Sequence, residues 1–319
     1  MTDLSLLFRE ELRKRLCFHS SSNVSREISA DGTRKYLIEG DDGGRVEAVM
    51  IKQPEWMTLC LSSQVGCGMG CTFCRTGEMG FQRNLTTSEI IRQVMLVSED
   101  SRTFEDSFSN IVFMGMGEPL HNYRQVVRAL KILVDPDGLA ISPKKITVSS
   151  VGLVPAIEKF GAEGLGINLA VSLNATTDEV RDRIMPINKA YPIETLFKTL
   201  RNFPLKSRGR ITIEYVLLSG VNDTSEDLSR LSRILRGLPV KINLIPYNEN
   251  AGLGFLSPPK ERVSEWCEEL KAEGFDTTIR WSKGRDINAA CGQLAVTRTF
   301  QPVIIRKAGK SKSGEAIQV

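Results

Sequence analysis

Short hydrophobic runs alternate with amphipathic segments along most of the chain. Six of these runs are rich in β-branched residues and are mostly bounded by Gly, Pro or Asn, a pattern typical of strands. They lie at residues 110–114, 145–150, 167–173, 210–218, 240–247 and 277–281. Because the runs are hydrophobic almost without interruption, we expect them to be buried on both faces, as the strands of a parallel sheet are.

Segments with helical periodicity separate the runs, at residues 87–98, 123–134, 178–184, 193–203, 224–236 and 260–273. One of them opens with Thr224 and two early acidic residues, which is typical of a helix N-terminus. Repeated strand–helix units predict an α/β fold with right-handed crossovers and a parallel sheet, either open or barrel-like. In such folds the functional residues gather at the C-terminal ends of the strands. Polar or Gly-rich segments follow four of the runs, at 115–119, 149–150, 172–174 and 246–248.

Residues 1–55 have a different pattern, which we interpret as a small β-rich N-terminal extension. A short basic helix is expected at 5–16, and the alternating segments KYLIEG and RVEAVMI flank a DDGG turn, as two strands would. The segment 301–319 is polar and basic, so we expect a flexible tail. The predicted organisation is an extension (1–55), an α/β core (56–300) and a tail (301–319).

The composition is that of a globular protein. The 319 residues are 41% hydrophobic and 25% charged, which suits one large α/β domain. No apolar run reaches about 18 residues, and charges interrupt the N-terminal segment where a secretory signal would be apolar. We therefore expect a cytoplasmic protein that does not enter a membrane. The formal net charge of +4 permits a polyanionic partner without requiring one.

Three of the seven cysteines form the motif Cys67-Gly-Met-Gly-Cys71-Thr-Phe-Cys74. Thiolate sulfur is the ligand that iron–sulfur clusters prefer, and the glycines allow the loop to wrap closely around a cluster. Three cysteines leave one iron open for a substrate, which is typical of a catalytic metal centre. The alternative is a structural zinc loop completed by a distant cysteine, although the chain has no second paired CxxC and only two histidines.

This cysteine motif, together with Gly115-Met116-Gly117-Glu118-Pro119 after the first predicted strand, resembles the radical S-adenosylmethionine (SAM) superfamily. The resemblance implies a partial (β/α)6 TIM-like barrel over residues 56–300. It also implies a [4Fe-4S] cluster on the three cysteines, where SAM is cleaved to methionine and a 5′-deoxyadenosyl radical. The segment 115–119 resembles the one that binds the methionine amine of SAM.

The segments that flank the motif make the resemblance more specific. Cys60 in TLCLSSQVGC, Cys291 in DINAACGQL, and the segments GFQRNLTTSEI, VFMGMGEPL, RIMPIN, IEYVLLSGVND and INLIPYN resemble the RlmN and Cfr family of adenine methyltransferases. The resemblance extends over residues 36–295. It implies methylation of C2 of an adenosine in 23S ribosomal RNA, with tRNA as an additional substrate.

The family mechanism explains the need for two further thiols, because adenine C2 is an electron-poor carbon that polar methyl transfer cannot reach. The resemblance implies that one SAM methylates Cys291 and that a second SAM provides the radical that takes a hydrogen atom from the S-methyl group. The resulting carbon radical adds to the base, Cys60 deprotonates the adduct, and a Cys60–Cys291 disulfide forms that must be reduced. Glu47 matches the acid that contacts the adenine and handles protons.

Further residues match SAM contacts of the family by their place at strand ends: Gly117, Glu118, Ser149, Ser172, Leu173, Asn174 and Asn248. Asn174 stands where the family frequently has His. Because the match begins near residue 36, we expect the family's helical accessory domain to be absent or reduced. No functional role is assigned to Cys17, His19 or Cys267, of which Cys267 is expected to pack in the core from a helix. His121 is expected to be a turn residue.

Two alternatives for the function stay open. One is a C8-methylating enzyme similar to Cfr, because the motifs do not separate C2 from C8. The other is a non-catalytic iron–sulfur or zinc module that binds RNA, although such a module would have no use for Cys60 and Cys291. The family chemistry also requires an electron donor such as flavodoxin or ferredoxin. The oligomeric state is left open, with a monomer as the default expectation.

Overall fold

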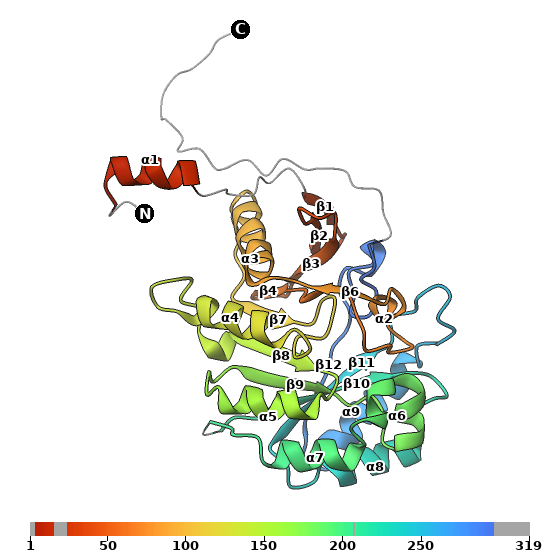
Figure 1. The fold of residues 1–319 in the computed structure, drawn as a ribbon. Helices are drawn as coiled ribbons and strands as arrows, with labels where there is room; N and C mark the ends of the chain where they lie inside the picture. The colour runs from red at the N-terminus through yellow and green to blue at the C-terminus, as the bar shows by residue number, and fades with distance from the viewer. Residues whose placement is uncertain (1–3, 16–23, 207, 297–319) are drawn as a thin grey trace.

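The computed structural model describes residues 4–15, 24–206 and 208–296, whose helices and strands are arranged as Figure 1 shows. The predicted tail at 301–319 lies outside the described residues, as do Cys17 and His19. Within the described residues, no helix is both long enough and apolar enough to cross a membrane.

Ten strands form one sheet, and seven neighbouring strands of it are parallel. In spatial order the parallel strands are β4 (Met57–Cys60), β7 (Asn110–Phe113), β8 (Ile146–Ser150), β9 (Asn168–Ser172), β10 (Ile211–Leu217), β11 (Val240–Pro246) and β12 (Asp276–Ile279). All six hydrophobic runs predicted to be strands are strands of this sheet. Strands β8 and β10 are buried along most of their length, as expected for a sheet covered on both faces.

Helices connect the parallel strands, and Figure 1 shows α4, α5 and α7 along the outside of the sheet. The helices of this part are α3 (Thr87–Arg102), α4 (Tyr123–Val134), α5 (Val154–Ala162), α6 (Asp178–Ile184), α7 (Ile193–Arg201), α8 (Ser225–Leu235) and α9 (Lys260–Ala272). Short 3-10 turns occur at Pro143–Lys145, Pro186–Lys189 and Arg285–Ile287. The predicted N-terminus at Thr224 is confirmed, because its side chain accepts a hydrogen bond from the amide of Asp227 and completes a capping box.

Helix α5 was not predicted, because its nine residues include a proline and a glycine. Pro155 lies in the first turn, where its missing N–H has no intrahelical partner to lose. Gly161 lies near the C-terminal end, and a Cβ atom there would come within 2.7 Å of Pro204. Both residues that obscured the helical pattern therefore fit the helix locally.

The N-terminal extension continues the same sheet. After α1 (Leu6–Arg15), the strands β1 (Val24–Ile28), β2 (Arg34–Glu39) and β3 (Arg45–Lys52) form an antiparallel meander, and β3 pairs antiparallel with β4. The predicted helix and both predicted strands of this region are confirmed. Whether 1–55 acts as a separate unit stays a prediction, since a continuous ladder joins it to the barrel.

A second, two-stranded sheet lies beside the barrel and was not predicted. It consists of β5 (Gln64–Gly66) and β6 (Phe81–Asn84), with the short helix α2 (Arg75–Glu78) between them. Among the described strands, no ladder joins β12 to β1, so the barrel stays open. The fold is thus the predicted partial (β/α)6 TIM-like barrel with a β-rich N-terminal extension, in which β4 and β7–β11 supply six parallel strands and β12 a seventh.

Candidate active site

The three motif cysteines lie on the loop between β5 and α2. Cys67 follows β5 directly, and Cys74 is the residue before α2. Gly66 has a φ of +73°, and a Cβ atom there would lie 1.9 Å from the carbonyl oxygen of Gly80. Only glycine fits this position. The amide of Cys67 donates to the same Gly80 carbonyl at 2.9 Å, so the β5–β6 hairpin fixes where the cysteine loop begins.

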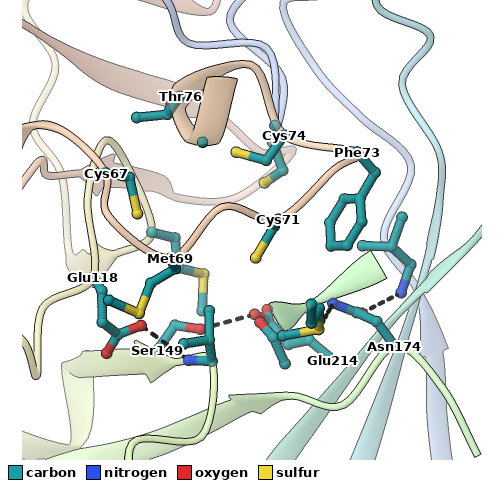
Figure 2. A pocket seen from close by; sticks show the side chains of 18 of the residues that line it. Cys67, Met69, Cys71, Phe73, Cys74, Thr76, Glu118, Ser149, Asn174 and Glu214 are labelled. Carbon is teal, nitrogen blue, oxygen red and sulfur yellow. Dashed lines mark hydrogen bonds between the residues drawn. The ribbon is translucent and has the colours of Figure 1, made fainter. Parts of the chain in front are cut away.

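The thiols of Cys67, Cys71 and Cys74 line one side of a cavity of about 1080 Å³ including the solvent at its mouth, which we call the cluster cavity. Figure 2 shows them on the side opposite Glu118 and Ser149. All three cysteines are free. Burial raises the pKa of all three, to about 12 for Cys67, and repulsion from neighbouring thiolates adds to the increase. Three buried thiolates need a cationic centre to be stable, and a metal cluster supplies one.

The arrangement of these thiols distinguishes two kinds of metal site. Among the residues that the structure describes, no three His, Cys, Asp or Glu side chains are placed to hold a single metal ion. A zinc site requires its ligand atoms at about 2.0–2.3 Å from one point, whereas a cubic cluster takes each thiolate on a different iron. The cysteine loop therefore fits a [4Fe-4S] cluster better than a structural zinc ion.

The segment after β7 faces the cysteine loop. Gly117 has a φ of +93°, and a Cβ atom there would lie 2.5 Å from the side chain of Gln64, so the close approach requires glycine. The carboxylate of Glu118 accepts hydrogen bonds from the amides of Leu120 at 3.1 Å and Val151 at 2.9 Å. Burial nevertheless raises the pKa of Glu118 to about 7. A buried carboxylate on the cavity wall is suited to a cationic ligand.

Most of the predicted SAM-contact residues do surround the cluster cavity. Its wall includes Gly117, Glu118, Ser149, Ser172, Asn174 and Asn248. Leu173 is the exception, because its side chain is fully buried, its amide donates to the Glu214 carbonyl of β10, and its carbonyl accepts from the Arg181 side chain of α6. Asn174 has a φ of +55°, and its side-chain oxygen accepts a hydrogen bond from the amide of Val216 at 2.8 Å. Asn tolerates this left-handed conformation better than most residues.

The loop that carries Cys291 is anchored to the cysteine loop and to the barrel. The amide of Arg75 donates to the Gly292 carbonyl at 2.9 Å, and the Thr76 hydroxyl donates to the Leu294 carbonyl at 2.6 Å. From the end of β11, the side-chain amide of Asn248 donates to the Cys291 carbonyl at 3.1 Å. Cys291 therefore lines the cluster cavity although it lies far from the motif in the sequence.

Cys60 and Cys291 meet at a second cavity, of about 480 Å³ including the solvent at its mouth. Cys60 is the last residue of β4 and is buried, and both cysteines are free. The pKa of Cys60 is raised to about 12, chiefly by burial and also by the charge of Cys291, while Arg280 opposes the increase. The structure thus brings together the two cysteines that the resemblance paired.

Arg280 and Glu214 are site residues that the sequence analysis missed. Arg280 Nη1 lies 3.4 Å from Glu214 Oε1 and 3.2 Å from Met114 Sδ. The negative charges of Cys291, Glu214 and Cys60 raise the pKa of Arg280 despite its burial. The hydroxyl of Ser149 donates to the other oxygen of Glu214 at 3.1 Å. The sequence did contain a signal for both residues, because each is a charged residue inside a hydrophobic run: Glu214 in ITIEYVLL and Arg280 in TTIRW.

Glu47 lies deep in β3 and does not line either of the two cavities. Lys35 Nζ is 3.2 Å from one carboxylate oxygen, and the other accepts a hydrogen bond from the amide of Ala295 at 3.0 Å. Burial raises the pKa of Glu47, and Lys35 opposes the increase. The predicted contact of Glu47 with adenine stays a prediction, since its partners here are the extension and the end of the Cys291 loop.

Cys267 and His121, which have no predicted catalytic or binding role, make structural contacts. Cys267 is buried in α9, with its sulfur 3.8 Å from the Thr277 carbonyl, as expected for a core residue. His121 lies beside the side chain of Gln64, at 2.9 Å, and packs edge-on against Phe81.

Comparison with known proteins gives the family. The sequence profile of the Radical SAM superfamily matches residues 61–231. The dual-specificity RNA methyltransferase RlmN of Geobacter sulfurreducens is 52% identical over 92% of this chain and 80% of its own length. The protein of the same name from Geotalea uraniireducens is 51% identical over 92% of this chain and 84% of its own.

A solved structure agrees with the sequence comparisons. The crystal structure of a radical SAM methyltransferase from Sphaerobacter thermophilus superimposes with a TM-score of 0.86 and 40% identity, over 92% of this chain and 86% of that one. The profile match, the relatives and the shared fold lead to one conclusion: this chain belongs to the radical SAM superfamily and, within it, to the RlmN family.

Proposed function

We propose that the chain is a radical SAM methyltransferase that methylates C2 of an adenosine in 23S ribosomal RNA and that also accepts tRNA. The observation that carries this proposal is the position of Cys291, which lines both cavities and has Cys60 as its neighbour in the second. The relatives are named dual-specificity RNA methyltransferases, which supports RNA as the substrate and methyl transfer as the reaction.

Cys67, Cys71 and Cys74 are the residues that would hold the [4Fe-4S] cluster in this assignment. The residues assigned to SAM are Gly117, Glu118, Ser149, Ser172, Asn174 and Asn248, whereas Leu173, which the resemblance also implied, does not line the cavity. When bound, the cluster and SAM supply one-electron chemistry that removes a hydrogen atom from an unactivated carbon. The carboxylates of Glu118 and Glu214 in the cavity wall favour the positive charge of SAM.

Cys291 has the role of methyl carrier. As a thiolate it accepts the methyl group of one SAM molecule, and it then presents this methyl group to the second, so that two SAM molecules are used per turnover. Backbone anchoring by Arg75, Thr76 and Asn248 keeps its side chain where the two cavities meet. This fixed position allows one sulfur atom to serve both steps.

Cys60 has the role of the base that removes the proton from C2 of the adduct. Burial holds the pKa of Cys60 at about 12 although Arg280 opposes the increase, so Cys60 is protonated at neutral pH until its surroundings change during the reaction. Methylation of Cys291 is such a change, because it removes a negative charge that raises the Cys60 pKa. The Cys60–Cys291 disulfide then releases the base, and an external reductant restores both thiols.

Mass spectrometry of the anaerobically reconstituted protein tests this proposal. We expect a methyl group on Cys291, and 2-methyladenosine rather than 8-methyladenosine in the treated RNA. Cys291→Ala should abolish methylation while retaining part of the SAM cleavage, and Cys60→Ala should accumulate a covalent protein–RNA adduct. Cys267→Ala, a buried cysteine of α9, is the matched control. Full methylation by Cys291→Ala would refute the carrier role.

The proposed reaction has consequences for partners and location. It needs a one-electron donor, for which we propose a flavodoxin or ferredoxin, and a ribosomal or transfer RNA substrate found in the cytoplasm. Replacing the reductant by a chemical one in the assay separates failure of the donor from failure of the enzyme.

A further inference from the structure

Arg181 of α6 is a buried cation that is held by neutral groups. Its relative exposure is 0%, although arginine is almost never fully buried unless its charge is paired. Its four hydrogen bonds within the described chain go to three backbone carbonyls and one side-chain amide oxygen. Because a buried charge is costly to stability unless a negative group compensates it, the surroundings of this guanidinium indicate what it is for.

The three carbonyls belong to the ends of two neighbouring strands. Arg181 Nη2 donates to the carbonyls of Val151 at 2.7 Å and Ser172 at 3.3 Å, and Nε donates to that of Leu173 at 3.0 Å. Val151 follows β8, Ser172 ends β9, and both line the cluster cavity. Gly152 leaves room for this contact, since a Cβ atom there would lie 3.2 Å from Nη2. The planar, five-donor guanidinium is thus able to join two strand ends.

The helix that carries Arg181 also supports the cysteine loop. The amide of Thr72, which lies between two motif cysteines, donates to the Ile184 carbonyl at 3.0 Å. The amide of Met185 donates to the carbonyl of Arg181 itself at 2.7 Å. Ile184 and Met185 belong to the same buried apolar cluster as Cys71. Through Arg181, α6 therefore connects the cysteine loop to the ends of β8 and β9.

The carboxylates near Arg181 are separated from it by an amide. Arg181 Nη1 donates to Asn188 Oδ1 at 2.9 Å, and Asn188 Nδ2 donates to Asp178 at 2.9 Å and to Asp182 at 2.7 Å. Burial lowers the pKa of Arg181 to about 10, and the negative charge of Cys71 opposes this more than either carboxylate does. Arg181 in turn opposes the increase in the pKa of Cys71. The guanidinium and the motif thiolates therefore stabilise each other.

We propose that Arg181 is a positioning residue with two effects: its guanidinium fixes the ends of β8 and β9 against the cysteine loop, and its buried charge stabilises the reduced form of the bound cluster. A cluster held by three thiolates is a negative centre, and reduction adds an electron to it. The charge and burial around a cluster set its potential, and attraction is strong where little water screens it. This inference rests on the proposed function, because it concerns the cluster and SAM in the site assigned to them.

Redox titration of the anaerobically reconstituted protein, followed by electron paramagnetic resonance, tests the effect of the charge. Iron analysis first establishes that each variant carries the cluster. At a fixed potential, the ratio of reduced to oxidised cluster should fall about tenfold in Arg181→Gln, a shift of about 59 mV. Arg181→Lys keeps the charge and should change the ratio less than about threefold. The matched control is Arg183→Gln, which removes an exposed charge from the same helix and should change the ratio less than about twofold.

Calorimetric titration with SAM tests the contact with the strand ends. Neither Lys nor Gln reproduces the fork of the guanidinium, so the Kd for SAM should rise about fivefold or more in both Arg181 variants. The Kd of Arg183→Gln should stay at the wild-type value. An unchanged redox ratio in Arg181→Gln, or an equal fall in Arg183→Gln, would overturn the effect of the charge. An unchanged Kd for SAM in Arg181→Lys would overturn the role at the strand ends.

Asp182→Asn tests the same charge from the opposite direction, in case Arg181→Gln does not take up the cluster. It removes a carboxylate that offsets the charge of Arg181 but keeps an oxygen that accepts from Asn188. The ratio of reduced to oxidised cluster should rise about twofold or more. An unchanged or lower ratio would contradict the effect of the charge.

The wild-type protein separates this inference from the proposed function. If it takes up no cluster, or if Cys291 stays unmethylated after treatment with SAM and a reductant, the proposed function fails, whatever the variants show. If the wild-type protein carries the cluster and S-methyl Cys291 while the Arg181 variants keep its redox ratio and its Kd for SAM, only the role of Arg181 is refuted.

Discussion

Substitution of Gly66 by alanine tests the physical basis of the cysteine loop. Gly66 is the residue before the first motif cysteine, and its φ of +73° is a conformation that disfavours a side chain. An L-residue in this conformation costs about 1–2 kcal/mol. The added Cβ atom would also lie 1.9 Å from the Gly80 carbonyl oxygen. Because a backbone atom cannot move aside, we add about 1–3 kcal/mol for overpacking, and expect a total loss of about 2–5 kcal/mol.

Gly80 offers a matched control within the same hairpin. Its φ is +70°, nearly the same as that of Gly66, but a Cβ atom there would meet nothing within 4 Å. Gly80→Ala should therefore cost only the conformational part, about 1–2 kcal/mol. The difference between the two variants isolates the clash with the carbonyl that accepts the Cys67 amide.

Urea unfolding of the cluster-free protein would measure both free energies, and iron analysis after anaerobic reconstitution would measure the effect on the cysteine loop. We expect Gly66→Ala to bind less iron than Gly80→Ala, because the clash displaces the start of the loop. Equal destabilisation by the two substitutions, or full iron content in Gly66→Ala, would show that the hairpin does not position the loop in the way argued above.

Three further predictions concern other parts of the molecule. Burial raises the pKa of Glu118 from 4.5 to about 7, so between these pH values the folded cluster-free protein binds a proton that the unfolded chain does not. Its free energy of unfolding should therefore fall by about 3 kcal/mol as the pH rises through this window. Denaturant titrations of Glu118→Gln should no longer show this pH dependence. Thr224→Ala removes the capping box with Asp227 and should lower the free energy of unfolding by about 1 kcal/mol, measured by urea titration against Thr224→Ser, which keeps the cap. Asp286→Ala removes the carboxylate that accepts hydrogen bonds from the Ser29 hydroxyl and the Ala30 amide of the N-terminal extension. Amide hydrogen exchange in the loop that carries Cys291 should then accelerate. Unchanged exchange would show that the N-terminal extension does not hold this loop.

Local patterns were sufficient for most of the fold. A strand buried on both faces needs a continuous apolar run and a helix needs an apolar stripe, so β7–β12 and six of the helices could be predicted from short segments. The elements that escaped prediction were short or irregular. Helix α5 is interrupted by Pro and Gly, and the β5–β6 hairpin depends on a close backbone approach at Gly66 that leaves little trace in hydropathy.

The residues of the candidate site also differ in how well their positions could be predicted from short segments of sequence. The motif cysteines are close in the sequence, so a single loop determines their proximity, and their spacing favoured a cluster before the resemblance implied one. The strand-end residues could be predicted because parallel strands end at the same edge of the sheet. Glu47 could not be placed in this manner, since its partners Lys35 and Ala295 come from a neighbouring strand and from the far end of the chain.

The sequence by itself determined the class of the protein: periodicity predicted a parallel α/β sheet, the spacing of three thiols favoured a cluster with an open iron, and the resemblance of the flanking segments implied the barrel and the chemistry. Only the tertiary structure decided that Cys60 and Cys291 share a second cavity with Arg280. The physical reason is that β4 and β12 lie at opposite ends of the parallel part of the sheet, and the curvature of the open barrel brings the C-terminal end of β4 close to the residues that follow β12. Curvature is a property of the whole sheet, and no single segment encodes it.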